Sequence, residues 1–322
     1  MRKLVGYIEQ EQPRINAVLA EETGRLDPLV RPVAEHVLLA GGKRLRPLLM
    51  LLCARALGRS GPELYLLASS FEFLHSATLL HDDILDGAVL RRGLPAAHLL
   101  FDRTRTILAG DVLLALGNRL MARAGDARLT DCIAEAIMHT ALGEIAEIAH
   151  IRDAGLTEEQ YLSIVTGKTA YLIQAACVCG AMYAGAGPDV ELAAGTFGLN
   201  LGIAFQLVDD ALDYSSSTQQ VGKPVGADLR EGKLTLPMLY YLRGLGDDER
   251  AAISDTLARN ALNEAEIERL VGDVRARGCD RAARELAGVY LRTAGQALTV
   301  FPPGMERSML EEMLEYVQTR EK

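Results

Sequence analysis

The sequence predicts an all-α protein built as a single large helical bundle. Apolar residues recur at spacings of three and four along most of the chain, as in segments 129–151 and 280–298, and this period is that of an amphipathic helix. Both segments are rich in Ala, Leu, Glu and Arg, which are good helix formers. No alternating run of Val, Ile and Thr lies between turn residues, so we expect no sheet.

Short breaks separate the predicted helices in chain order. They fall at residues 58–63, 91–96, 153–159, 185–189, 215–237 and 301–304. No linker or change in composition divides the chain, so residues 1–322 are predicted to form one domain of roughly ten or more helices. The break at 215–237 is the longest, and long loops in compact domains tend to be functional.

The composition limits the possible functions. The chain has 322 residues, 49% of them apolar, which is enough for a sizeable core and argues against disorder. Its net charge of −9 disfavours a nucleic-acid partner. The five cysteines form no C-x-x-C pair, so neither a disulfide framework nor a structural zinc site is expected. Residues 1–13 lack the apolar stretch of a signal peptide, and we expect a cytoplasmic protein.

One uncharged segment, residues 169–188, is long enough to raise the question of a membrane span. It contains Gln174 and many small residues. A helix that is buried on all sides within a bundle accounts better for this composition. The sequence therefore predicts no transmembrane segment.

Two acidic motifs of the form DDxxD, at 82–86 and 209–213, point to metal chemistry. On a helix, the first and last aspartates of each motif lie four positions apart and share one face. Carboxylates are hard oxygen ligands that suit magnesium, which usually binds a few carboxylates together with substrate phosphates. Because each motif directly follows apolar sequence, a solvated helix end is the weaker interpretation. The pair indicates two magnesium half-sites that clamp a diphosphate.

A second set of residues supplies positive charge for a phosphate ligand. The segment GGKRLRP, 41–47, combines Lys43, Arg44 and Arg46 with two glycines that let the backbone approach an anion closely. Arginine also matches the geometry of phosphate. Further cations in apolar or glycine-bearing surroundings are Arg91, Arg92, Lys168, Lys223 and Lys233. Together, the two acidic motifs and these cations predict two bound phosphate groups, one held through metal ions and one held directly by the protein.

In chain order, the segments GGKRLRP, EFLHSATLLHDDILDGAVLRRG, GKT, FQLVDDALDY and GKPVGADLREGK resemble the motifs of the trans-isoprenyl diphosphate synthases. The resemblance runs from about residue 36 to about 240, with a weaker match to about 300. It implies a bundle of the isoprenoid synthase type around a deep central cavity. It also implies a magnesium-dependent prenyltransferase that joins isopentenyl diphosphate head-to-tail and in trans to an allylic diphosphate, preferably farnesyl diphosphate.

The resemblance implies a role for each matching residue. The implied ligands of three magnesium ions are Asp82, Asp86, Asp209, Asp210 and Asp213, with Asp83 in support. The implied contacts of the allylic diphosphate are Arg91, Lys168, Lys223 and Lys233. Those of the isopentenyl diphosphate are Lys43, Arg46, His75 and Arg92. The residues that would line the space of the allylic cation and the isopentenyl group are Thr169, Gln206 and Phe205. The set implied to act in catalysis is Asp82, Asp83, Asp86, Lys168, Thr169, Gln206, Asp209 and Lys223.

The length of the product is expected to depend on the residues one turn before Asp82. Ala77 and Thr78 are small, whereas the resemblance implies an aromatic residue here, or an insertion in the first motif, in short-chain members. We therefore expect a long-chain product, with octaprenyl diphosphate for a quinone side chain as the preferred choice. Candidates for the cavity floor, each of which could equally be an ordinary core residue, are Met121, Ile133, Ile137 and Met138.

Other interpretations stay open at this point. One is a short-chain farnesyl or geranylgeranyl diphosphate synthase, and another is a non-catalytic subunit of a heteromeric synthase. A terpene cyclase is disfavoured because the second motif reads DDALD and GGKRLRP is present. The expected partners are the two diphosphate substrates and a second copy in a homodimer, with loose membrane association only through the product. Two alternatives stay open for Glu144, a cavity-facing position or an ordinary one. Residues 319–322 could close over the site or fray, and fraying is the expected outcome.

Overall fold

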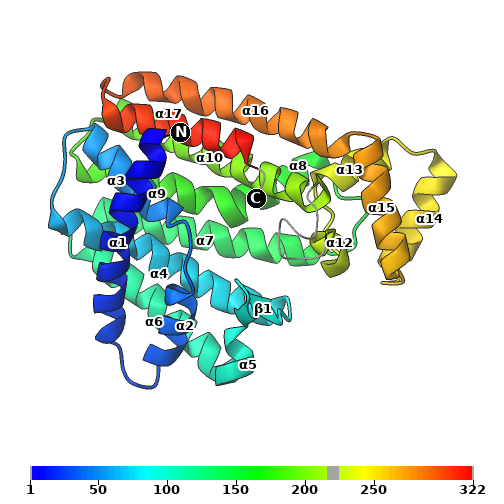
Figure 1. Cartoon of the computed structure of the whole chain (residues 1–322), viewed down its shortest axis with the longest axis horizontal. Helices are drawn as coiled ribbons and strands as arrows, with labels where there is room; N and C mark the ends of the chain where they lie inside the picture. The colour runs from blue at the N-terminus through cyan, green and yellow to red at the C-terminus, as the bar shows by residue number, and fades with distance from the viewer. Residues whose placement is uncertain (1, 216–224, 321–322) are drawn as a thin grey trace. The chain divides into compact units, whose positions relative to one another are not determined.

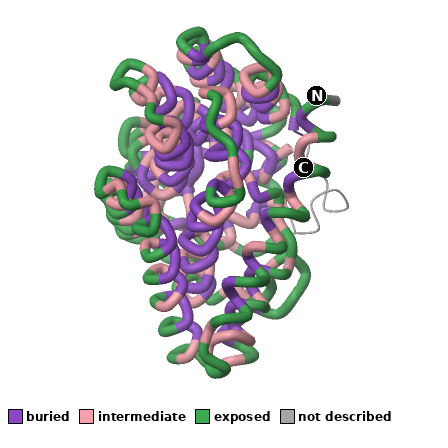
Figure 2. Tube along the Cα trace, turned by 90° about the vertical axis from the view of Figure 1, so that its left-hand side faces the viewer, coloured by how far each residue is buried: buried purple, intermediate pink, exposed green. Residues whose placement is uncertain are grey.

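The structure, a computed structural model, describes residues 2–215 and 225–320. This part of the chain is helical almost throughout, which confirms the all-α prediction (Figure 1). Along most helices buried residues alternate with exposed ones, so each helix turns one face toward a core (Figure 2). The chain divides into two compact units, and the prediction of a single domain stays a prediction.

The first unit comprises residues 1–137, 172–195 and 298–312. Its main elements are α1 (Arg2–Gly24), α2 (Arg31–Leu39), α3 (Leu45–Ala56), α4 (Pro62–Leu85), α5 (Ala97–Phe101), α6 (Arg103–Ala122), the start of α7 (Ala127–Ala149), most of α9 (Tyr171–Tyr183) and the 3-10 turn η2 (Leu298–Val300). Helix α4 packs against α3 and α6, and α1 packs against α2 and α4. Because α4 is buried on nearly every side, the residues that it carries are held rigidly.

A small hairpin follows α4 and corrects the expectation of no sheet. Strand β1 (Leu90–Arg91) pairs antiparallel with β2 (Leu94–Pro95). Between them, Arg92 and Gly93 both have positive φ, 53° and 80°, as a two-residue hairpin turn requires. The strands are too short to show an alternating pattern, so the sequence reads as a plain break. The hairpin fixes the two arginines that follow the first acidic motif.

The second unit comprises residues 138–171, 196–297 and 313–322. Its main elements are the end of α7, α8 (Glu158–Val165), the π-helical turn η1 (Thr166–Ala170), most of α10 (Pro188–Ser215), α12 (Ala227–Glu231), α13 (Leu236–Arg243), α14 (Asp247–Ala258), α15 (Glu264–Ala276), α16 (Cys279–Ala297) and the end of α17 (Met305–Thr319). Helix α13 packs against α8, α15 and α16. The core of this unit includes Tyr214, Tyr241 and Leu270.

Three glycines allow the backbones of α7 and α10 to contact the backbone of the π-helical turn η1 directly. A Cβ atom on Gly143 of α7 would lie 2.3 Å from the backbone nitrogen of Lys168, and one on Gly167 would lie 2.9 Å from the Cα atom of Gly143. A Cβ atom on Gly202 of α10 would lie 2.6 Å from the Cα atom of Ala170. No larger residue fits these contacts. They place η1 directly between α7 and α10.

The predicted loop at 215–237 is shorter than expected, because it contains a helix. Helix α12 begins after Gly226 and ends before Gly232, both of which adopt left-handed conformations. Asp213 accepts hydrogen bonds from the backbone nitrogens of Ala227 and Asp228, both at 3.1 Å. The capping carboxylate of α12 belongs to the preceding helix, α10. The sequence next to α12 therefore contains no residue that would identify its N-terminal cap.

Two helical stretches, Glu158–Tyr183 and Pro188–Ser215, have the length and composition to cross a membrane. Within the protein, 56% of each apolar window is buried, as in the core helices of soluble proteins. In α9 no residue is exposed, which confirms the prediction of a buried helix at this position.

Candidate active site

The first acidic motif lies at the end of α4. Asp82 is partly buried on the last turn of this helix, and Asp86, its C-terminal cap residue, is exposed. Asp83 differs from both, since it is 2% exposed and accepts hydrogen bonds from the guanidinium of Arg91, with the Nε atom at 2.8 Å. The first and last carboxylates of the motif therefore face solvent more than the middle one does.

Positive charge gathers around His75, which lies about two turns before the motif on α4. Burial lowers the pKa of His75 well below its usual value, and the charges of Arg46 and Arg92 lower it further. Arg46 is partly buried, and loss of solvation lowers its pKa to about 10 against the opposing charge of Glu72. The guanidinium of Arg92 lies on the backbone at Gly42 and donates to the carbonyl of Gly41. The predicted isopentenyl diphosphate contacts Arg46, His75 and Arg92 thus lie together, with Lys43 exposed in the adjoining loop.

Arg44 has a different role from its neighbours in the GGKRLRP segment. It adopts a left-handed conformation at the start of α3 and is buried. Its Nη1 atom donates to Glu72 at 2.6 Å, and its Nε atom donates to Asn16 at 2.9 Å. Arg44 therefore holds the loop to α4 and α1. Glu72 was missed from the sequence, because a glutamate within an apolar run gives no sign of its distant partner.

In the second acidic motif, each carboxylate has a different partner. Asp209 pairs with the guanidinium of Arg320 at 3.0 Å, and its side chain is 49% exposed. Asp210 is buried and accepts hydrogen bonds from the hydroxyl of Tyr161 and, at 2.7 Å, from Gln206. Asp213 caps α12. As in the first motif, the second aspartate is the most deeply buried of the set.

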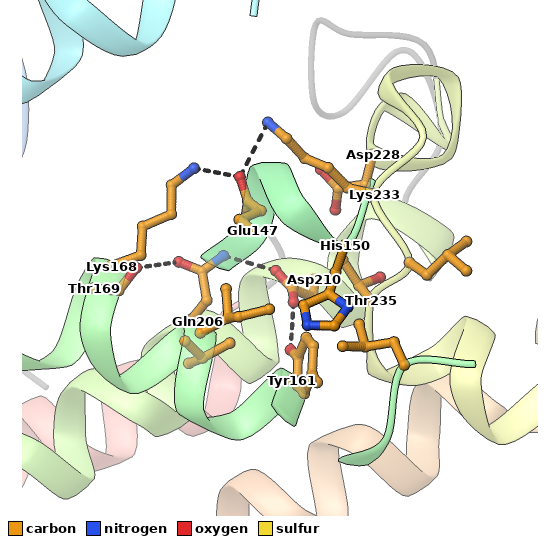
Figure 3. Close-up of a pocket in the computed structure, with 14 residues that line it drawn as sticks. Glu147, His150, Tyr161, Lys168, Thr169, Gln206, Asp210, Asp228, Lys233 and Thr235 are labelled. Carbon is orange, nitrogen blue, oxygen red and sulfur yellow. Dashed lines mark hydrogen bonds and ion pairs between the residues drawn. The ribbon is translucent and has the colours of Figure 1, made fainter. Parts of the chain in front are cut away.

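A cavity of about 150 Å³ opens beside Asp210 (Figure 3). Along one wall, acidic and basic side chains alternate. Lys168 lies 2.7 Å from Glu144 and 2.6 Å from Glu147, and Lys233 lies 3.6 Å from Glu147 and 2.8 Å from Glu231. Two of the predicted diphosphate contacts, Lys168 and Lys233, therefore share one carboxylate. Glu144 pairs with a site residue, and Glu147 was missed from the sequence.

Burial and charge shift several pKa values in this cavity. Burial raises the pKa of Asp210 to about 7, against the hydrogen bonds from Tyr161 and Gln206. Burial also raises the pKa of Asp228, whose neighbours Asp210 and Asp213 add to the effect. For Lys168, burial lowers the pKa, but the carboxylates of Glu147 and Glu144 outweigh it and the pKa is raised. A cation bound near these buried carboxyl groups would stabilise their ionised forms.

The residues implied to bind magnesium have suitable chemistry. The set consists of carboxylates, which are hard ligands, and the first and last members of each motif lie four apart on one helix. Within residues 2–215 and 225–320, no three metal-binding side chains converge on one point.

The end of the chain corrects another expectation. Instead of fraying, Arg320 is buried and lies over the ring of Phe205, with 4.4 Å between the guanidinium carbon and the ring centroid. Its backbone carbonyl accepts hydrogen bonds from Arg284 of α16 at 3.1 and 3.2 Å. The partners are far apart in sequence, so the short TREK segment gives no sign of them. Lys223, a predicted contact of the allylic diphosphate, lies outside the described residues. So do residues 321–322, the last two of the segment that was expected to fray.

Among the predicted chain-length residues, burial separates two groups. Ala77 of α4, Met121 of α6 and Ile133 of α7 are fully buried. Ile137 and Thr78 are partly buried. Met138 is 55% exposed, so it does not have the burial expected of a cavity floor. The sequence pattern could not distinguish it, because apolar residues occupy both faces of this part of α7.

Comparisons with known proteins agree with this arrangement. A family model described as Polyprenyl synthetase matches residues 27–274. The octaprenyl diphosphate synthase of Escherichia coli (strain K12) is 33% identical over 302 residues, which cover 94% of this chain and 93% of that protein. Component 2 of the heptaprenyl diphosphate synthase of Bacillus subtilis (strain 168) is 32% identical over 303 residues, covering 93% and 85%.

A solved structure shows the same fold. The polyprenyl synthase of Caulobacter crescentus CB15, complexed with calcium and isoprenyl diphosphate, superposes with a TM-score of 0.93 and is 37% identical. The match covers 100% of this chain and 98% of that one. Its bound calcium agrees with the use of a divalent cation.

Proposed function

The chain belongs to the polyprenyl synthetase family and is a long-chain trans-prenyltransferase that depends on a divalent metal; on this basis we propose that it makes octaprenyl diphosphate. The allylic primer is farnesyl diphosphate, which is extended by isopentenyl diphosphate. The similarity to an octaprenyl diphosphate synthase over nearly the whole chain is the observation that carries the product length. Such a product has the length of a quinone side chain.

The metal is magnesium, in three ions. Asp82, Asp86 and Asp209 are the direct ligands, and Asp83 and Asp213 support them. When bound with the allylic diphosphate, the metal neutralises the negative charge that develops on the leaving group. The oxygen chemistry of these side chains and the exposure of Asp86 and Asp209 support this assignment.

The isopentenyl diphosphate binds to Lys43, Arg46, His75 and Arg92. The support comes from charge, because four arginines act on His75 while the nearby carboxylates of Glu72 and Asp83 are already paired. An anion that enters this cluster relieves repulsion between neighbouring cations. Binding there holds the isopentenyl double bond in place for attack on the allylic carbon.

The allylic diphosphate binds to Arg91, Lys168, Lys223 and Lys233. Its oxygens replace Glu147 as the counter-charge of the two lysines in the cavity. Carbon–oxygen cleavage then leaves an allylic cation, which Thr169 and Gln206 stabilise with their oxygens. Phe205 packs on the isopentenyl group. The 2.9 Å hydrogen bond between Thr169 and Gln206 supports a joint action of these two residues.

The growing tail passes Ala77 and Thr78 and ends near Met121, Ile133 and Ile137. The small size of Ala77 and the burial of the last three support this path. The test is incubation of the protein with farnesyl diphosphate, isopentenyl diphosphate and magnesium, followed by chromatography of the dephosphorylated products. Octaprenol is the expected product. A product that stops at farnesol or geranylgeraniol length would contradict the proposal, and absence of any product would indicate a subunit that needs a partner.

The protein acts as a cytoplasmic homodimer. On α7, four exposed apolar residues occur at helical spacing, namely Met138, Leu142, Ile145 and Ile148. An apolar stripe of this kind is unfavourable in water and is typical of a protein interface. A second copy of the chain covers it. Light scattering of the purified protein should give twice the monomer mass, and Ile145→Glu should shift it to the monomer.

A further inference from the structure

Four polar side chains, three of them buried and Gln206 partly buried, form a continuous hydrogen-bonded chain along the cavity (Figure 3). Thr169 donates to the amide oxygen of Gln206 at 2.9 Å, and the amide nitrogen of Gln206 donates to Asp210 at 2.7 Å. On the other side, the hydroxyl of Tyr161 donates to the second oxygen of Asp210. Tyr161 is 4% exposed and Asp210 is 5% exposed. The four residues come from α8, η1 and α10.

The direction of each hydrogen bond determines the next one. An ionised carboxylate only accepts, and both oxygens of Asp210 accept hydrogen bonds here, so the side of Gln206 that faces Asp210 is its NH₂ group. The amide oxygen then faces Thr169. If Asp210 lost its place, the amide could rotate and turn its N–H groups toward Thr169. The orientation of Gln206 therefore depends on a carboxylate that Tyr161 holds from the opposite side.

We propose that Tyr161 is a positioning residue, which fixes Asp210 as the anchor of the Gln206 amide, and that Asp210 in this role is not a magnesium ligand. This inference rests on the proposed function, in which Gln206 and Thr169 face the allylic cation. Oxygen lone pairs stabilise a cation, whereas N–H groups destabilise it, so a rotated amide raises the barrier to ionisation. Asp210 is 5% exposed and each of its oxygens already accepts a hydrogen bond, whereas the side chain of Asp209 is 49% exposed, so magnesium binds Asp209 and not Asp210.

The first test is Tyr161→Phe, which removes the hydroxyl and keeps the ring. The expected result is a fall in kcat of roughly tenfold to hundredfold, because a misoriented group near the reacting centre is costly. The KM values of both substrates should stay within about twofold, since the amide contacts neither diphosphate. The half-saturating magnesium concentration should also be unchanged. An unaltered kcat in Tyr161→Phe would overturn the proposal.

A matched control removes an equivalent hydroxyl elsewhere in the same unit. Tyr241 is buried, and its hydroxyl donates to Asp273 at 3.2 Å, away from the residues that line the cavity. Tyr241→Phe should show wild-type kcat, even if both variants lose similar amounts of thermal stability. An equal fall in kcat for the two tyrosine variants would show a general effect of destabilisation and would contradict the assigned role of Tyr161.

The second test measures metal binding without turnover. Magnesium with a non-hydrolysable diphosphate analogue should raise the melting temperature of Asp210→Asn as much as that of the wild type, whereas Asp209→Asn should lose most of this rise. Loss of the rise in Asp210→Asn would show that Asp210 is a ligand and would overturn the proposal. In the double variant with Tyr161→Phe, kcat should fall no further than in Asp210→Asn alone. A wild-type protein without prenyltransferase activity would instead refute the proposed function.

Discussion

The two acidic motifs have the same pattern of letters but are held in different ways. The first ends a helix next to a hairpin, and a single partner, Arg91, binds its second aspartate. The second motif lies within α10, and its members are engaged by Arg320, by Tyr161 and by the start of α12. The repeated sequence therefore predicts the type of ligand but not the contacts that each carboxylate makes.

A shared feature appears once these contacts are compared. Asp83 and Asp210, the second residues of the motifs, are both nearly inaccessible and hydrogen-bonded. Asp86 and Asp209 are exposed, and Asp82 is partly buried. The middle carboxylate stabilises the local structure in each case, and Asp82, Asp86 and Asp209 are more accessible to a metal, whereas Asp213 caps α12.

The largest expected effect comes from removing one outer carboxylate from each motif. Asp82→Ala and Asp209→Ala should each lower kcat by about a thousandfold, because metal and substrate charge depend on both. Their melting temperatures without metal should stay near that of the wild type. Asp131→Ala, which removes an exposed carboxylate of α7, serves as a control and should be fully active. Near-normal turnover of either site variant at saturating magnesium would show that one motif is dispensable.

The second prediction separates the two substrates. Arg46→Ala should raise the KM of isopentenyl diphosphate at least about tenfold and leave that of farnesyl diphosphate nearly unchanged, because a charged hydrogen bond is lost from one site only. Lys168→Ala should show the reverse, and Lys223→Ala should resemble it. Steady-state kinetics with each substrate varied in turn provide the measurement. Arg119→Ala, on the exposed face of α6, should alter neither KM. Equal effects on both substrates would remove the distinction between the two sites.

The third prediction concerns α4, which carries both the first motif and the path of the tail. Ala77→Phe should shorten the product by several isoprene units, because a ring there blocks the tail while Asp82 is unchanged. Overpacking costs about 1–3 kcal/mol of stability, so Ala68→Phe, at another fully buried position of the same helix, is the matched control. The control should keep the wild-type product length. Unchanged products in Ala77→Phe, measured by chromatography, would mean that the tail takes another route.

The smallest expected effect concerns the contact that occupies Asp209. Arg320 must leave this carboxylate before a metal ion can bind it, since both are cations that compete for the same oxygens. Arg320→Ala should therefore lower the magnesium concentration for half-maximal thermal stabilisation by roughly threefold to tenfold. Arg307→Ala breaks the ion pair with Glu311 on α17, the helix that precedes Arg320, and should have no such effect. A higher magnesium requirement in Arg320→Ala would show that the arginine assists binding instead.

Local patterns were sufficient to predict the helices, the acidic motifs and the cations around them. The helices at 129–151 and 280–298 were confirmed to within a few residues as α7 and α16. The residues that organise the site were missed, because each acts on a partner far along the chain. Tyr161 and Asp210 are 49 positions apart, and Arg320 and Asp209 are 111 apart. A pattern with a period of three or four residues cannot report such contacts, and only packing creates them.

The close contact of η1 with α7 and α10 also limits how this protein can evolve. Because Gly143, Gly167 and Gly202 bring three backbones into contact, the position of Lys168 and Thr169 follows from the main chain and not from adjustable side chains. Substitutions elsewhere on α7 and α10 can therefore reshape the apolar walls while the reacting groups keep their place. Product length and reaction chemistry can diverge independently, and the three glycines are the positions where drift should be least tolerated.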